Sequence, residues 1–138
     1  MDTNLALRDA TVQDIQLELI RRFKFNAFDG ERVVAKLLEH RSLWTAALLD
    51  RVGESRRYGP LLLPLLGLIK LRDLPDNLWN ADTLYLLTLS QQTARELGQV
   101  LETAELGGEL IVYDDQSEID AAVGTSHPEF GLVTVWWD

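Results

Sequence analysis

The stretch "TLYLLTLSQQTARELGQVLETAELGGELIVYDD", residues 83–115, decides the fold class. It opens on an apolar run rich in residues that favour strands. Ala94, Leu97 and Leu101 then recur at three- and four-residue spacing, which is typical of one face of a helix. Residues 109–115 return to an apolar run and end in two carboxylates. The stretch therefore predicts a strand, a helix and a second strand.

The residues that follow extend this alternation to the end of the chain. Residues 116–123 are typical of a short helix, with Asp115 as its N-cap and Gly124 just past its end. The run "LVTVWWD", residues 132–138, predicts a third strand. This β-α-β-α-β order predicts an α/β fold with a small, mostly parallel sheet of three to four strands. Nearly continuous apolar strands are typical of a sheet that is covered on both faces.

The N-terminal half predicts helices. Thr11 and Asp14 resemble a capping box at the start of a first helix. Asp29 is placed to cap a second helix. The spacing of three and four residues puts two sets of apolar residues on helical faces: Val12, Ile15, Leu19 and Phe23 in the first helix, and Val33, Val34, Leu37 and Leu38 in the second.

The sequence between these helices and residue 83 has three predicted pieces. Residues 42–53 are interpreted as a third helix that begins at Ser42 and ends at Gly53, or as a continuation of the second helix. Residues 60–67 predict a short helix and residues 68–71 a brief strand. The whole chain of 138 residues has the length of a single domain, mainly helical in residues 1–72 and β-α-β-α-β in the acidic residues 73–138.

Charge is distributed unevenly along the chain. Residues 1–72 hold 12 Lys or Arg and 9 Asp or Glu, whereas residues 73–138 hold 13 Asp or Glu and a single basic residue, Arg95. Such an acidic half repels the phosphates of nucleic acid and attracts a cationic protein. We expect part of this charge to pair within the fold with four arginines of the first half: Arg21, Arg22, Arg56 and Arg57.

Cysteine content and hydropathy restrict the compartment. The chain has no cysteine, which excludes disulfides, a thiol nucleophile and thiolate metal sites. Its most apolar stretch, residues 60–69, is much shorter than the roughly 20 residues that span a bilayer. The N-terminus lacks the basic and apolar regions of a signal peptide. We expect a soluble cytoplasmic protein that does not bind a membrane.

The carboxylates after residue 112 are one candidate site. In a parallel sheet, the carboxyl ends of the strands carry ligand sites. Asp114 and Asp115 would lie there together with Thr88, Ser90 and Asp138. These oxygens suit Mg²⁺ or Ca²⁺. The interpretation that we favour is simpler, with Asp115 acting only as the cap of the next helix.

The polar, turn-rich segment "DLPDNLWNAD", residues 73–82, is a second candidate. Binding residues are concentrated in loops, and tryptophan is enriched at binding hot spots. Trp79 and Asp82 are therefore candidate binding residues, although Trp79 would equally serve to cover the sheet.

Motif searches give no sign of catalysis. The sequence lacks the glycine-rich nucleotide motifs, a zinc-binding H-E-x-x-H and a G-x-S-x-G nucleophile elbow, and we expect no cofactor or bound metal. The sequence predicts a non-catalytic protein-binding domain of the inhibitor, immunity or adaptor type, with a basic protein as its partner. The alternative is a small enzyme or divalent-metal-dependent binder with its site around Asp114 and Asp115. A homodimer that joins basic and acidic halves is a further alternative.

Overall fold

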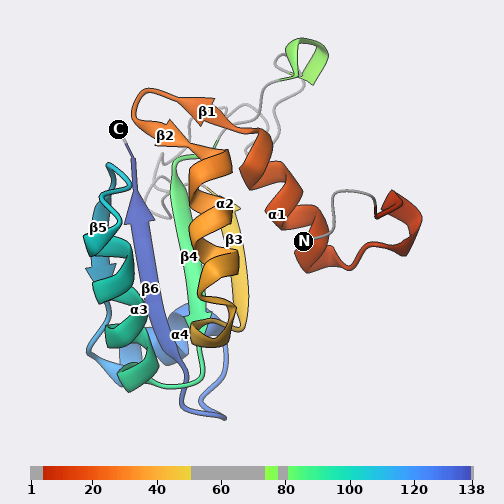
Figure 1. Cartoon of the computed structure of the whole chain (residues 1–138). Helices are drawn as coiled ribbons and strands as arrows, with labels where there is room; N and C mark the ends of the chain where they lie inside the picture. The colour runs from red at the N-terminus through yellow and green to blue at the C-terminus, as the bar shows by residue number, and fades with distance from the viewer. Residues whose placement is uncertain (1–4, 51–73, 78–80, 138) are drawn as a thin grey trace, which may run out of the picture.

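The computed structural model describes residues 5–50, 74–77 and 81–137 (Figure 1). The predicted helix over 60–67 and the predicted strand over 68–71 lie outside these ranges, as do Trp79 and Asp138. The described residues also include three short 3₁₀ turns: η1 (Leu7–Asp9) before the first helix, η2 (Arg41–Leu43) and η3 (Leu74–Asp76).

The first helix, α1 (Val12–Arg22), begins at the predicted capping box. The Thr11 hydroxyl accepts the Asp14 N–H at 3.0 Å, and the Asp14 carboxylate accepts the Thr11 N–H at 2.9 Å. Both bonds satisfy backbone donors that a helix start leaves without a partner. The prediction of this helix and its cap is confirmed.

The buried face of α1 differs from the predicted one. Leu17 and Ile20 are buried, whereas Val12 is 77% exposed and Ile15 is 37% exposed. The buried stripe begins with Gln13, whose side chain reaches a strand of the sheet. The hydrophobicity pattern did not predict this buried face, because the pattern counts only apolar residues and the face begins with the polar residue Gln13.

A two-stranded hairpin joins α1 to the second helix. It pairs β1 (Lys24–Phe25) with β2 (Phe28–Asp29). The helix α2 (Gly30–Glu39) then begins where predicted, with the Asp29 carboxylate accepting the Arg32 N–H. A Cβ atom on Gly30 would collide with the Ile20 and Phe23 carbonyl oxygens, so only glycine allows the start of α2 to approach the end of α1 this closely.

The helix predicted over residues 42–53 is wrong in the part that the structure describes. Residues 46–50 form a strand, β3 (Ala46–Asp50), in which Ala47 and Leu49 are buried and Leu48 is exposed. The alternation of buried and exposed residues follows the two-residue period of a strand. Before it, Trp44 is buried and donates its indole N–H to the Leu37 carbonyl at 2.8 Å.

The acidic half forms the predicted elements in the predicted order. They are β4 (Thr83–Thr88), α3 (Gln91–Thr103), β5 (Glu109–Val112), α4 (Gln116–Val123) and β6 (Gly131–Trp136). Asp115 caps α4, and Gly124 follows it in the left-handed conformation with φ 87°. These predictions are confirmed.

The predicted parallel sheet is wrong. The four strands lie in the order β3-β4-β6-β5, and every neighbouring pair is antiparallel. Because β4 and β5 both run opposite to β6, the β4-α3-β5 unit does connect two strands of the same direction. The last strand, β6, separates them instead of extending the sheet at its edge. The class remains mixed α and β.

The burial of β6 explains its central position. Five of its six residues are buried, so both of its faces are covered. Figure 1 shows α2 and α3 in front of the sheet and α4 behind it. Leu84, Leu86, Val133 and Val135 form the middle of the core on the α3 side, whereas the buried Ile119 of α4 lies on a helix that contacts β6 from behind. An apolar strand covered on both faces is thus a central strand here, not a sign of a parallel sheet.

Candidate protein-binding surface

The end of β5 carries the two acids that the sequence singled out. The Asp115 carboxylate accepts the Ser117 N–H at 2.9 Å and the Ser117 hydroxyl at 2.6 Å. These hydrogen bonds to the carboxylate hold the pKa of Asp115 below its usual value. Asp115 therefore acts as a helix cap. Its neighbour Asp114 is exposed.

Neighbouring polar groups at this end of the sheet stabilise helix starts. The Thr88 hydroxyl donates to the Ser90 carbonyl at 2.7 Å, and the Ser90 hydroxyl accepts the Thr93 N–H at 3.1 Å at the start of α3. The Gln91 amide donates to the Gln116 side chain at 2.7 Å, which ties the starts of α3 and α4 together. Of the groups predicted to bind a ligand, Thr88, Ser90 and Asp115 thus make local hydrogen bonds at helix starts, whereas Asp114 is exposed.

Asp82 lies at the opposite end of the sheet from Asp114 and Asp115. It precedes β4, where its N–H donates to the Asp50 carbonyl at 3.1 Å and its carbonyl accepts the Trp137 N–H at 2.9 Å. The six residues of β4 separate the two ends by about 20 Å. The candidate residues do not form one site, and Trp79 lies outside the described residues.

Within residues 5–50, 74–77 and 81–137, no three His, Asp or Glu side chains gather closely enough to share a metal ion. None of the helices in these ranges is long and apolar enough to cross a bilayer.

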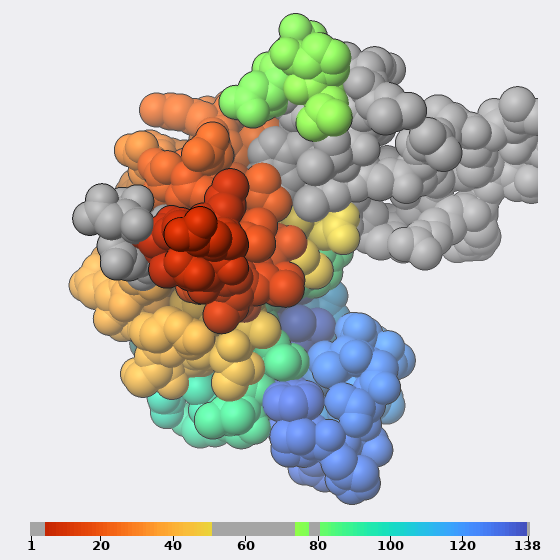
Figure 2. All heavy atoms as spheres, turned by 90° about the vertical axis from the view of Figure 1, so that its right-hand side faces the viewer, coloured from red at the N-terminus to blue at the C-terminus, as the bar shows by residue number. Residues whose placement is uncertain are grey.

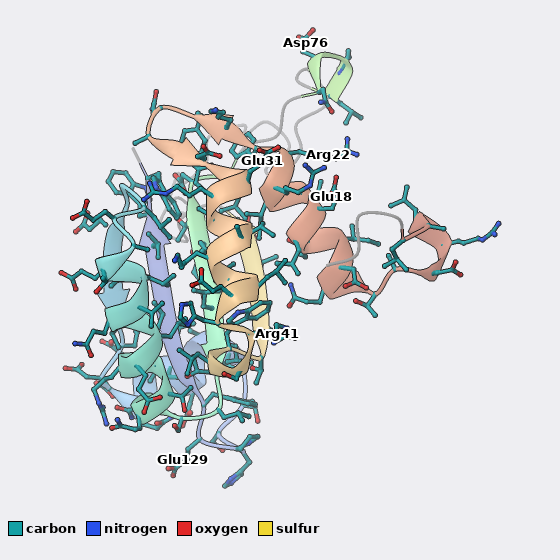
Figure 3. The ribbon with its side chains drawn as sticks, viewed as in Figure 1. Glu18, Arg22, Glu31, Arg41, Asp76 and Glu129 are labelled. Carbon is teal, nitrogen blue, oxygen red and sulfur yellow. The ribbon has the colours of Figure 1, made fainter. Side chains whose placement is uncertain are left out.

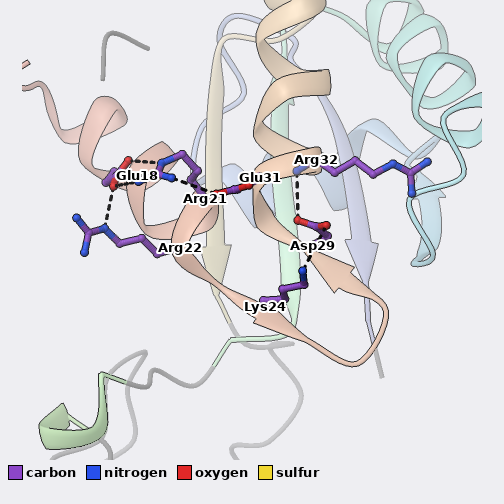
Figure 4. A network of polar contacts seen from close by, with 7 residues as sticks. All are labelled: Glu18, Arg21, Arg22, Lys24, Asp29, Glu31 and Arg32. Atoms are coloured by element: carbon purple, nitrogen blue, oxygen red, sulfur yellow. Dashed lines mark hydrogen bonds and ion pairs between the residues drawn. The ribbon is translucent and has the colours of Figure 1, made fainter. Parts of the chain in front are cut away.

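The ion pairs between described residues all lie within the first forty residues of the chain. Glu18 is their centre, because its carboxylate accepts hydrogen bonds from both Arg21 and Arg22 (Figure 4). Arg21 also reaches Glu31 at 3.5 Å. The hydrogen bond from Arg21 is the largest cause that lowers the pKa of Glu18 to about 2; burial opposes it, and the hydrogen bond from Arg22 lowers the pKa further. Figure 3 shows this group at the hairpin end of α1, far from Glu129.

Two of the four arginines expected to neutralise the acidic half do not pair with it in the part of the chain that the structure describes. Arg21 and Arg22 pair with acids of their own half, and Arg56 and Arg57 lie outside the described residues. Five exposed acids on α3, β5 and the loop after β5 form no ion pair with another described residue. We call them the acidic surface: Glu96, Glu102, Glu105, Glu109 and Asp114.

One cation of the first half does contact this surface, through the backbone. The Arg32 guanidinium donates to the Ala104 and Glu105 carbonyls at the end of α3. Free carbonyls at a helix C-terminus attract cations. The contact shows that the end of α3 accepts a guanidinium, although the carboxylates beside it stay without an ion pair among the described residues.

Two hollows border the acidic surface. One, of about 420 Å³, lies between α2 and α3 and is lined by polar and apolar side chains that include Lys36, His40 and Glu96. The other, of about 200 Å³, lies between the end of α3 and the start of β5, with Leu101 and Leu110 as its apolar wall and Glu102 and Glu105 as its acids. Sequence reasoning found neither, because each hollow needs two helices or a helix and a strand that fold together.

Comparisons of the chain with models of protein families, with curated proteins and with solved structures found no match. The fold and the distribution of charge therefore carry the functional argument.

Proposed function

We propose that this chain is a non-catalytic protein-binding domain, of the inhibitor, immunity or adaptor type, whose acidic surface binds a basic protein. One observation carries the proposal. Of the four arginines expected to neutralise the acidic half, the two that the structure describes, Arg21 and Arg22, pair instead with Glu18 and Glu31. Exposed carboxylates left in this way produce a negative potential that speeds the approach of a cationic partner and orients it.

The alternative of a metal-dependent site around Asp114 and Asp115 gains little from the geometry. The Asp115 carboxylate accepts two hydrogen bonds from Ser117. The other acid of the candidate set that the structure describes, Asp82, lies at the far end of β4. A site for a single Mg²⁺ or Ca²⁺ ion would need these carboxylate oxygens to converge on one point.

Salt and charge variants test the proposal. Immobilised wild-type chain should retain a basic protein at low salt and release it as salt rises, because about 1 M salt shortens the Debye length to roughly 3 Å. The triple variant Glu96→Gln, Glu102→Gln, Glu105→Gln should lose this retention. A matched control, Asp9→Asn, Glu31→Gln, Glu39→Gln, removes the same charge from the first half and should keep it.

Three results would contradict the proposal. They are tight binding of DNA or RNA by the purified chain, a partner whose retention ignores salt, and equal losses in both triple variants. A dimer that dissociates with salt and retains no partner would favour self-association instead.

A further inference from the structure

The strand β5 presents backbone groups at the rim of the sheet that pair with no strand in the described part of the chain. Among the described strands it pairs with β6 alone, and the Tyr113 N–H donates to the Leu132 carbonyl at 3.0 Å. In an antiparallel pair, alternate residues direct both backbone groups to the same side. Glu109 and Ile111 therefore face β6, whereas Leu110 and Val112 direct their N–H and C=O groups away from the sheet.

The opposite rim of the sheet is closed. The side chain of Gln13 on α1 hydrogen-bonds both backbone groups of Ala47 on β3. Figure 2, which views the molecule from the β3 side, shows the N-terminal residues and α1 in front of this rim. At β5, no hydrogen bond from another described residue reaches Leu110 or Val112, and the strand carries neither the lysine nor the proline that usually blocks such an edge.

On the helix side of the β5 edge, the smaller hollow suits a basic side chain. Leu110 and Val112 point to this side, because a Cβ on Gly98 of α3 would collide with Val112 and because Leu110 lines the smaller hollow. An apolar wall with carboxylates suits lysine or arginine, whose stem packs on apolar surface while its head stays at the charge. Glu102 and Glu105 supply those carboxylates.

The position of Arg95 specifies where the basic side chain should lie. Arg95 precedes Glu102 by two turns on the same side of α3. Since α3 runs back along the sheet before β5 begins, Arg95 lies towards the Val112 end and the two acids towards Leu110. A basic residue is therefore favoured opposite Leu110. On the other side of the strand, Ile111 is 48% exposed and offers an apolar contact.

We propose that β5 binds an extended basic peptide segment of the partner as a fifth, antiparallel strand of the sheet. The proposal rests on the proposed function and specifies its mode. Backbone groups of the segment pair with Leu110 and Val112, a lysine or arginine opposite Leu110 reaches Glu102 and Glu105, and an apolar residue covers Ile111. Main-chain bonds supply affinity and alternate side chains supply specificity in this mode of recognition.

Charge argues against a second copy of the chain as the occupant. Two β5 strands paired about Ile111 would place Glu109 of one copy opposite Tyr113 of the other and bring the acids of both copies, Glu109 and Asp114, to one shared edge. Like charges placed across neighbouring strands are destabilising. A cationic segment in the same place meets the opposite charge of Glu109, Asp114, Glu102 and Glu105, with Arg95 as the described cation at the Val112 end.

The test uses a capped heptapeptide of alternating lysine and valine with the full-length chain. In antiparallel pairing, the residues opposite Leu110 and Val112 share both the helix side and the inward backbone direction. Methylation of the lysine backbone nitrogens should therefore weaken binding on the order of tenfold or more, because it removes inward donors. Methylation of the valine nitrogens, which point to solvent, should leave the affinity within about twofold.

Two readouts on the protein complete the test. The peptide should slow hydrogen exchange at the Leu110 and Val112 amides, which are open in the free chain. The variant Glu102→Gln, Glu105→Gln should weaken binding by about tenfold at low salt, whereas Glu118→Gln, Glu129→Gln, with the same charge change, should weaken it far less.

The outcomes separate the binding mode from the proposed function. If both methylated peptides bind alike and the two amides stay unprotected, the strand-addition mode is wrong while salt-sensitive retention of a basic protein can still stand. If the same amides are protected from hydrogen exchange at high protein concentration without peptide, the edge binds a second copy of the chain and the peptide proposal is wrong. Failure of peptide and protein retention together would overturn both proposals.

Discussion

Gln13 closes the edge of β3 by imitating a neighbouring strand at Ala47. Its side-chain oxygen accepts the Ala47 N–H at 2.8 Å, and its side-chain nitrogen donates to the Ala47 carbonyl at 2.8 Å. Ala47 is only 4% exposed, so water could not replace these bonds fully. One amide thus anchors α1 to the sheet and satisfies the outward backbone groups of Ala47, whereas no hydrogen bond from another described residue does this for Leu110 and Val112 of β5.

Replacing Gln13 by methionine should destabilise the fold. Gln13→Met keeps the length of the side chain but leaves both Ala47 groups without partners, which we expect to cost about 1–3 kcal/mol of unfolding free energy. Urea unfolding at pH 7 measures the change. The exposed Gln99 of α3 provides a control, since Gln99→Met should shift the free energy by less than about 0.5 kcal/mol. Equal shifts in the two variants would show that the Gln13 bonds contribute nothing.

The Glu18 centre should make stability depend on acid pH. The pKa of Glu18 is about 2 in the folded chain, below its usual value of 4.5. A group with a lowered folded pKa contributes stability that is present above the usual pKa and is lost as pH falls towards the folded pKa. We therefore expect Glu18→Gln to be less stable than wild type at pH 7 and the difference to shrink between pH 4.5 and pH 2. A difference that stays constant over this range would contradict the ion-pair explanation.

Local signals in the sequence predicted three helix caps correctly, at Thr11, Asp29 and Asp115, because a cap needs only a side chain and a backbone group two or three residues apart. The cap at Ser90 was not predicted, and the helix start predicted at Ser42 was wrong. The strands of the acidic half were also predicted from a local signal, since each is an apolar run in the sequence. In contrast, β3 was predicted as helix, because its short "AALL" core has no strand-forming β-branched residue.

The arrangement of the strands could not be predicted from such signals. The β-α-β-α-β order is compatible with β6 at the edge or between β4 and β5, and its position depends on long-range pairing. The Gln13–Ala47 contact joins residues 34 apart and leaves no periodic trace. The candidate surface could not be predicted either, since Glu102 and Glu105 became candidate binding residues only through their position beside the β5 edge. Asp115, whose cap is local, was interpreted correctly.

The Asp115 cap gives a prediction that also bears on the metal alternative. Asp115→Ala removes the acceptor of two Ser117 bonds and should lower the urea midpoint at neutral pH. Because the folded pKa is lowered, this loss should diminish as pH falls below the usual Asp value of about 3.9. Addition of Mg²⁺ or Ca²⁺ should not raise the wild-type midpoint. A large metal-dependent rise that is absent in the variant would establish a metal site instead.

The two tryptophans at the end of β6 should differ sharply in importance. Trp137 is 1% exposed, packs edge-on against Phe28 at 4.7 Å between ring centroids, and donates its indole N–H to the Leu106 carbonyl at 3.1 Å. Trp136 points to the other side of the sheet and is only partly buried. The buried ring joins the hairpin, the end of α3 and the sheet.

We expect Trp137→Ala to cost about 3–5 kcal/mol of unfolding free energy and Trp136→Ala clearly less, because a buried aromatic ring leaves a cavity when removed. Trp137→Phe keeps most of the ring but leaves the Leu106 carbonyl without its donor, which should cost about 1–3 kcal/mol. Urea unfolding orders the three variants. Deletion of residues 136–138 should accordingly give insoluble or molten protein, recognised by lost near-UV circular dichroism with secondary structure retained. A truncated chain that unfolds cooperatively at an unchanged midpoint would show instead that Trp137 is dispensable to the core.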